Sequence, residues 1–375
     1  MKRVRTRKKI PFSPSFGKKP KIFIGREGIS DKILDSLYED NGIYRTSVIT
    51  GLRGMGKTAL LSEIESELRS EQDWIVVSTS TTEHLLSNVI GNLQLEIAEK
   101  QSTIPKLSAI SFSVLGLGFK LEMQEKVQAS NFQTIMKKCI AELTKAGIGV
   151  LFTIDEVSNT SEMKEFAATY QLLLREDFDV ALLMAGLPHN VNELISDDVL
   201  TFLRRASIIH LEGIELTTIK TAYQRVFEGE EIDLEGDSLE LLSVTTKGYP
   251  YLFQLLGSEL WQLNQKVISE NDVRIASING KNKMYSSVHS LIYRELSDAD
   301  QQFLMAMAED VAETKIIDIR KRMEKSSGFI SKYRERLMTI GIIESKKYGT
   351  VQFVLPYMRD YLLEKKKELR ISNEL

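Results

Sequence analysis

The chain has 375 residues, 42% of them hydrophobic and 27% charged, a composition that indicates a globular protein with two or three compact units. No apolar stretch approaches the roughly 18 residues that a membrane helix needs, and the basic N-terminus lacks the apolar run of a secretion signal. One cysteine, Cys139, cannot form an internal disulfide, so we expect a cytoplasmic protein without membrane association.

Charge is distributed unevenly along the chain. The formal net charge is -3, but residues 1–21 carry nine basic and no acidic side chains, and residues 315–370 carry fifteen basic and seven acidic ones. All other residues together therefore carry -20. Basic ends around an acidic middle suggest a polyanionic partner bound at the ends. A solubilising tail and a solvated helical face are the alternative interpretations.

Residues 1–21 contain three prolines and no apolar periodicity, which predicts a basic arm that is extended or disordered. From residue 22 to residue 213, short apolar runs alternate with helical patterns. The runs lie at 46–50, 74–78, 148–154 and 180–185, and the helices at 31–38, 58–68, 83–99, 133–145 and before 176. Short apolar strands separated by helices indicate an α/β core with a parallel sheet covered on both faces.

The apolar spacing becomes purely helical at 214–295, which predicts a small helical lid domain. Residues 296–375 predict three helices, at 297–309, 315–323 and 327–340, followed by two strands, at 342–346 and 351–355, and a final helix. Three helices and a β-hairpin are the pattern of a winged helix-turn-helix.

The segment 51–58 reads GLRGMGKT and matches the pattern G-x-x-x-x-G-K-[ST] between an apolar strand and a helix. Glycines let successive N–H groups point inward, and the helix dipole adds to the attraction for phosphate. We expect Lys57 to neutralise the β and γ phosphates of ATP and the Thr58 hydroxyl to bind Mg²⁺. An ordinary glycine-rich turn is the alternative. The predicted nucleotide-binding residues are Gly51, Arg53, Gly54, Met55, Gly56, Lys57, Thr58 and Ala59.

The apolar run 148–154 ends in the acidic pair Asp155 and Glu156. We expect Asp155 to hold Mg²⁺ through its waters and Glu156 to polarise the water that attacks the γ-phosphorus. The alternative is an acidic pair that merely ends a strand at the surface.

Together with the FIGRE segment at 23–27, these motifs and the domain order resemble the AAA+ ATPases, specifically the origin-recognition initiator group and its archaeal and bacterial relatives. The resemblance implies that Phe23, Ile24, Gly25 and Arg26 lie against the adenine and that ATP sits between core and lid. It also implies that an arginine from a neighbouring subunit completes the site, so that the chain self-associates there. Arg204 and Arg205 match the position of that arginine finger; a surface pair bound to a carboxylate is the alternative.

Two positions depart from the family pattern. After the fourth strand, where a polar γ-phosphate sensor is usual, the chain reads MAGLPHN, with His189 and Asn190 as the polar candidates. The lid has GYPYLFQ at 248–254 where many relatives present an arginine. This form resembles signalling ATPases that act as slow nucleotide switches, so we expect slow hydrolysis.

A winged helix usually places its third helix in the DNA major groove and its hairpin against the backbone. The corresponding tentative duplex-DNA contacts are Ser327, Ser331, Lys332, Arg334, Arg336, Lys346 and Lys347. Docking to a protein is the alternative role. A loosely alternating stretch at 110–123 predicts a β-hairpin. The resemblance to initiator-type AAA+ proteins implies that an insertion at this point contacts DNA; packing on a neighbouring subunit is the alternative.

The four histidines are widely spaced, so no metal beyond Mg²⁺ is expected, and Cys139 fits a helical core position. The leading hypothesis is an ATP-dependent protein that controls nucleoprotein assembly on DNA, in replication or in a mobile element. A switch in signalling or anti-phage defence is the second hypothesis. The protein partner would be a transposase, a helicase or a defence effector.

Overall fold

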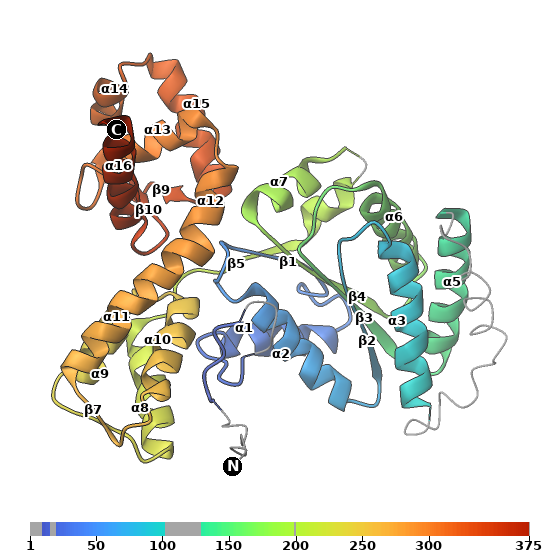
Figure 1. Cartoon of the computed structure of the whole chain (residues 1–375). Helices are drawn as coiled ribbons and strands as arrows, with labels where there is room; N and C mark the ends of the chain where they lie inside the picture. Colours follow the sequence, from blue (N-terminus) through green and yellow to red (C-terminus); the bar gives the residue numbers. More distant parts are fainter. Residues whose placement is uncertain (1–9, 16–19, 102–128, 199, 375) are drawn as a thin grey trace, which may run out of the picture. The chain divides into compact units, whose positions relative to one another are not determined.

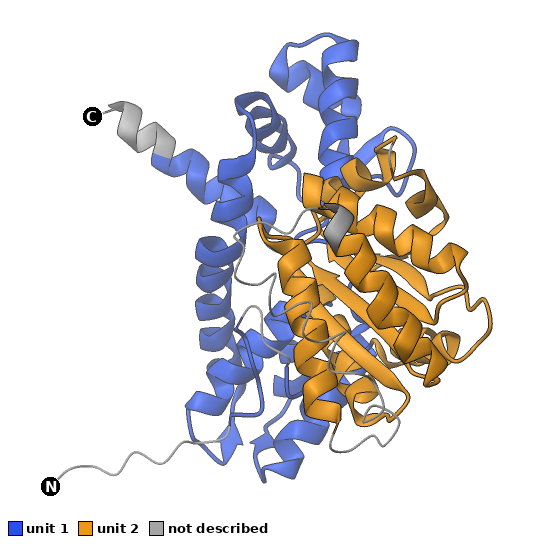
Figure 2. Ribbon diagram, turned by 90° about the vertical axis from the view of Figure 1, so that its right-hand side faces the viewer, with its two compact units in different colours: residues 1–25, 52–56, 212–375 blue, residues 26–51, 57–211 orange. Residues whose placement is uncertain are grey.

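The computed structural model describes residues 10–15, 20–101, 129–198 and 200–374. The described chain forms two compact units, which Figure 2 colours separately. Unit 1 contains residues 1–25, 52–56 and 212–375, and unit 2 contains residues 26–51 and 57–211. The hairpin predicted at 110–123 lies outside the described residues.

Unit 2 is built on a five-stranded parallel sheet (Figure 1). Its strands are β1 (Thr46–Thr50), β2 (Trp74–Ser80), β3 (Gly149–Asp155), β4 (Val180–Gly186) and β5 (Ser207–His210), in the order β2-β3-β4-β1-β5. The predicted α/β class with a parallel sheet is therefore confirmed. The apolar runs predicted the strands because both faces of a parallel sheet are buried.

The helices of unit 2 are α1 (Glu27–Leu37), α2 (Lys57–Ser70), α3 (Leu85–Lys100), α5 (Ala129–Lys145), α6 (Ser161–Arg175) and α7 (Pro188–Ser196), with a 3₁₀ turn at Thr201–Arg205. Alternate strand residues such as Val48, Phe152 and Leu182 pack with α3, α5, α6 and α7 in one apolar core. The opposite face meets α2, where the hydroxyl of Thr153 donates to the carboxylate of Glu65.

The first part of unit 1 is helical. Its helices are α8 (Leu216–Gly229), α9 (Ser238–Thr245), α10 (Pro250–Gln262), α11 (Glu270–Met284) and α12 (Ser290–Glu295), with a small parallel pair β6 (Asp233–Leu234) and β7 (Val267–Ile268). A π-helical turn, Tyr285–His289, joins α11 to α12 without a break. Such turns are rare and frequently occur at functional positions.

The C-terminal module of unit 1 has helices α13 (Asp298–Met307), α14 (Ile316–Met323), α15 (Ser327–Ile340) and α16 (Met358–Glu374). The strands β8 (Thr314–Lys315), β9 (Ile343–Glu344) and β10 (Thr350–Phe353) form an antiparallel sheet with β10 in the middle. Gly341 ends α15 in the left-handed conformation, which glycine adopts without steric cost.

The N-terminal segment corrects one prediction. Phe12 is only 2% exposed, because its ring packs among Tyr223, Phe227 and Phe253 at centroid distances of 5.6 to 5.9 Å. The amide of the next residue, Ser13, donates to the Gln254 side chain. The prediction of a disordered arm is therefore wrong for residues 10–15, because one aromatic side chain holds them in the core of unit 1.

Candidate functional site: the phosphate-binding loop

The segment 51–58 connects β1 to α2. Gly54 and Gly56 adopt left-handed φ angles of 80° and 90°, which side chains other than glycine rarely tolerate, so the loop curls tightly before α2 begins at Lys57. The Lys57 ammonium donates to the Gly51 carbonyl at 2.8 Å. The lysine therefore lies over the loop, next to the amides at the start of a 14-residue helix.

Asp155 ends β3, two strands away from β1, because β4 lies between them. Its carboxylate accepts a hydrogen bond from the Thr58 hydroxyl, with 2.6 Å between Oγ1 and Oδ2. This contact brings together the two residues that the sequence predicts as magnesium ligands. Hydroxyl and carboxylate oxygens are ligands that Mg²⁺ accepts, usually with waters and phosphate oxygens completing the shell, so the donor set fits.

Glu156 follows the strand with a φ of 54°, an uncommon conformation for a residue other than glycine. Its amide donates to the Asp155 carboxylate at 2.9 Å, and its own side chain is exposed. The left-handed turn therefore separates the two acids: Asp155 contacts Thr58, and Glu156 remains available to solvent. Among the described residues, no group of three His, Cys, Asp or Glu side chains could hold a metal.

Sequence reasoning missed a residue just before α10 that contacts the loop within unit 1. Tyr249 is 1% exposed, and its hydroxyl donates to the Arg53 carbonyl. A Cβ on Gly54 would lie 2.6 Å from the same hydroxyl oxygen, so the tyrosine packs directly on the loop. Burial raises the pKa of Tyr249, which keeps the phenol protonated as a donor. The aromatic GYPY segment was the available signal.

The other predicted nucleotide contacts lie in partly buried positions. Phe23 and Ile24 are half-buried, and Gly25 has a left-handed φ of 67°. A Cβ on Gly25 would lie 2.7 Å from Ile214 Cγ2, a residue of the same unit. The Arg26 carbonyl accepts the Ser30 amide and so begins α1. Their role against an adenine ring stays a prediction.

The candidate arginine finger occupies the 3₁₀ turn before β5, the edge strand of the sheet. Arg204 Nε donates to the Ile195 carbonyl at 3.3 Å, and its guanidinium lies 3.5 Å from the fully exposed Asp198 carboxylate. The Arg205 side chain is exposed and makes no hydrogen bond or ion pair with the described part of the chain. The sensor candidates His189 and Asn190 lie in the first turn of α7, half-exposed.

The predicted DNA contacts fall into two groups. Ser327, Ser331 and Lys332 are exposed on α15, and Arg334 is half-buried there. The other three basic side chains have acidic neighbours: Arg336 pairs with Asp300 at 3.3 Å, Lys346 with Glu344 at 3.2 Å and Lys347 with Glu313 at 3.3 Å. Asp300 is completely buried, so Arg336 compensates a buried carboxylate.

A family model described as a domain of unknown function, DUF8462, matches residues 286–362. No curated protein matches the chain. None of the described helices is long and apolar enough to cross a membrane.

Among solved structures, the chain is similar to the Walker-type ATPase of Pyrococcus abyssi, with 17% identity over 92% of this chain and 97% of that chain and a TM-score of 0.65. Two others are Cdc6p from Pyrobaculum aerophilum, with 14% identity, 94% and 97% coverage and a TM-score of 0.49, and the Orc1 protein of Aeropyrum pernix in complex with DNA, with 12% identity, 96% and 97% coverage and a TM-score of 0.46. The chain therefore has the fold of the AAA+ P-loop ATPases, which confirms the resemblance at the level of the fold.

Proposed function

We propose that the chain binds ATP with Mg²⁺ through the loop 51–58. The contact between Thr58 and Asp155 carries this proposal, because it joins the predicted magnesium ligands from the start of α2 and the end of β3. Lys57, now bonded to the Gly51 carbonyl, would turn to the β and γ phosphates, and the amides at the start of α2 would donate to phosphate oxygens. Mg²⁺ would supply charge neutralisation between the phosphates.

Hydrolysis is proposed to be slow. Glu156, exposed beside Asp155, is the proposed residue that orients the attacking water. Arg204 or Arg205 of a neighbouring subunit would stabilise the charge that develops on the transferred phosphoryl group. The proposed lid has the sequence GYPY where an arginine would serve as second sensor. Tyr249 of this segment donates a hydrogen bond to the Arg53 carbonyl of the loop. One fewer cation at the phosphates favours a nucleotide switch over a fast motor.

We further propose that the nucleotide state controls assembly on duplex DNA. In this proposal residues 22–213 are the AAA+ core, 214–295 the lid, and 296–375 a winged helix; the three helices α13 to α15 and the antiparallel β9–β10 pair support the last assignment. The DNA-facing surface would be α15, with Ser327, Ser331 and Lys332 as its exposed contacts. A cytoplasmic location remains a prediction.

One observation favours the second candidate, a signalling or defence switch whose C-terminal module binds a protein. Both wing lysines, Lys346 and Lys347, have acidic partners, and so does Arg336. These pairs reduce the positive charge that the module offers to a phosphate backbone. A protein partner with its own acidic and basic side chains would suit such a mixed surface.

The test has two parts. Binding of a fluorescent ATP analogue with Mg²⁺ should be lost in Lys57→Ala and preserved in Lys145→Ala, which removes an exposed, ion-paired lysine of α5. Binding to a labelled duplex should then be measured from low to moderate salt, with ATP and without it. Unchanged nucleotide binding by Lys57→Ala refutes the proposed nucleotide site. If the protein does not bind the duplex at low salt, either with or without ATP, the DNA proposal fails and the protein-binding switch is favoured.

A further inference from the structure

The short segment between α9 and α10 contacts two distant parts of unit 1. It contains Lys247 and Gly248, whose φ angles are 49° and 77°. The Thr246 hydroxyl accepts the Gly248 amide at 3.2 Å, and the Thr246 carbonyl accepts the Tyr249 amide at 2.9 Å. These bonds hold the segment as a tight unit, so a displacement at one end reaches the other.

One end of this segment is attached to the phosphate-binding loop. The Tyr249 hydroxyl donates to the Arg53 carbonyl, and its ring lies against Gly54. Residues 52–56 accordingly group with unit 1, although the strand before them and the helix after them belong to unit 2. The lid tyrosine therefore sets the position of loop backbone that would contact phosphate.

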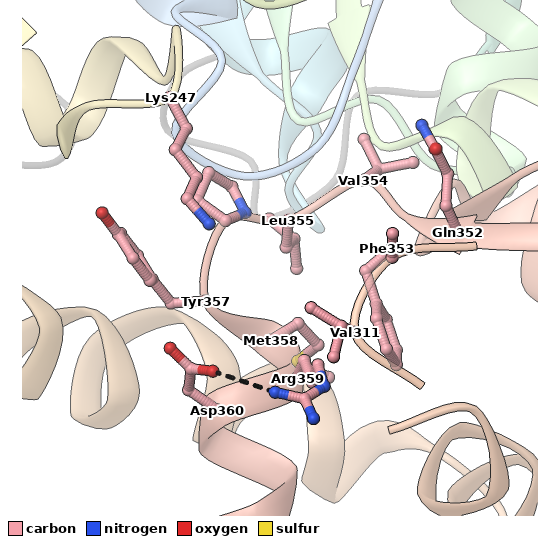
Figure 3. A pocket seen from close by; sticks show the side chains of 12 residues that line it. Lys247, Val311, Gln352, Phe353, Val354, Leu355, Tyr357, Met358, Arg359 and Asp360 are labelled. Atoms are coloured by element: carbon pink, nitrogen blue, oxygen red, sulfur yellow. Dashed lines mark ion pairs between the residues drawn. The ribbon is translucent and has the colours of Figure 1, made fainter. Parts of the chain in front are cut away.

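The other end is attached to the C-terminal module. The Tyr357 hydroxyl donates to the Thr245 carbonyl at 2.6 Å. The Tyr357 ring also receives two ammonium groups, from Lys247 at 4.4 Å and Lys281 at 4.5 Å from its centroid. Figure 3 shows Lys247 extending toward this ring, with Asp360 below it. Asp360 Oδ2 lies 3.7 Å from the Lys281 ammonium and partly balances the two charges.

Tyr357 occupies an unusual position for its size. Its φ of 62° is left-handed, a conformation that a bulky residue keeps only when its surroundings impose it. A cavity of about 380 Å³ adjoins it, lined by Lys247 and by residues 352–360 among others (Figure 3). The free space beside Tyr357 leaves room for this side chain to move.

We propose that Tyr249 is a positioning residue for the phosphate-binding loop, and that the bond from Tyr357 to Thr245 places this loop under the control of the C-terminal module. A partner that displaces Tyr357 releases the segment 245–249 and loosens the loop; a bound nucleotide, by reciprocity, stabilises the docked tyrosine. The consequence for ATP rests on the proposed function, whereas the mechanical link does not.

The test uses the full-length chain and three variants that each lose one hydroxyl group: Tyr249→Phe, Tyr357→Phe and, as control, Tyr361→Phe. Tyr361 lies in the same module and stacks on His289. Amide hydrogen exchange of residues 52–56 without nucleotide should become about fivefold faster in the first two variants, as expected for the loss of one net hydrogen bond, and stay unchanged in the control.

Affinity for the fluorescent ATP analogue should fall by about the same factor in the first two variants. In the double variant the losses should not multiply, because both act through one segment. Unchanged exchange of residues 52–56 in Tyr357→Phe refutes the link, even if ATP binds normally. Failure of the unmodified protein to bind ATP refutes the proposed function, and the exchange measurement still decides the link.

Discussion

His289 predicts an acid-sensitive junction between the first helical part of unit 1 and the C-terminal module. It lies in the π-helical turn, is completely buried, and its Nε2 is 2.9 Å from the Pro356 carbonyl. Burial lowers the pKa of His289 from 6.5 to about 4, although the hydrogen bond to Pro356 acts in the opposite direction. The folded protein therefore keeps this imidazole neutral at pH values where the unfolded chain is protonated.

The sign and the size of the change in stability with pH follow from proton linkage. Because the folded pKa is depressed, the junction is most stable above pH 6.5 and loses stability as the pH falls toward 4. A difference of roughly 2.5 pKa units at 1.36 kcal/mol per unit gives a maximum loss of about 3 kcal/mol, of which about 2 kcal/mol appears between pH 7 and pH 5.

The assay is amide hydrogen exchange of residues 285–295 at pH 7 and pH 5, corrected for the intrinsic pH dependence of exchange. The opening free energy of this segment should fall by about 2 kcal/mol in the unmodified protein. His289→Gln keeps a donor for Pro356 but cannot be protonated, so its opening free energy should be nearly the same at both pH values. His210→Gln, at an exposed histidine of β5, should behave like the unmodified protein. The same pH dependence in His289→Gln would refute the reasoning.

Three further predictions concern single side chains. Phe12→Ala should destabilise unit 1 by about 3 kcal/mol in urea unfolding, because a buried aromatic ring is removed. Gly54→Ala should weaken binding of the ATP analogue at least about tenfold, because the loop needs a φ of 80° and the added methyl would meet Tyr249. Arg336→Gln should destabilise the C-terminal module by about 1 to 2 kcal/mol without DNA, because Asp300 stays buried without its cation and Arg336 itself is 48% exposed.

Each of these variants has a control in which a comparable substitution is made at a position without the decisive contacts. The control for Phe12→Ala is Leu95→Ala, at a leucine of α3 that is 61% exposed, and it should leave stability nearly unchanged. Gly328→Ala adds a methyl group where nothing lies within 4 Å, so ATP binding should persist. Lys332→Gln removes an exposed cation of α15. If Lys332→Gln destabilises the module as much as Arg336→Gln, the buried-carboxylate argument is wrong.

The sequence could predict those features whose structure is determined by residues close together in the chain. Buried strands such as β3 and β4 are continuous apolar runs, and the loop 51–58 has a glycine pattern that few other structures require. The contact between Thr58 and Asp155 could also be expected, because Asp155 ends β3 and Thr58 follows β1 at the same edge of the parallel sheet.

Features that depend on distant partners could not be predicted. Phe12 lies between prolines in a segment without periodicity, and nothing nearby shows that Gly257, on α10, leaves room for its ring. The strand β8 has two residues, too few for a pattern. Tyr249 belongs to an aromatic segment that reads as ordinary helix core, and its bond to Arg53 joins positions 196 residues apart.

The order of the central sheet has a consequence for synthesis on the ribosome. All five residues of β1 pair with β4, which pairs with β3 on its other side, so β4 forms the only hydrogen-bonded bridge between those two strands within the described sheet. Thr58 is made early and Asp155 later, but the strand that spaces them ends at Gly186. A nascent chain that stops before that glycine contains the proposed loop 51–58 and the proposed magnesium ligands Thr58 and Asp155, but it lacks the complete strand that aligns them. We expect ATP binding to begin only after this strand has left the exit tunnel.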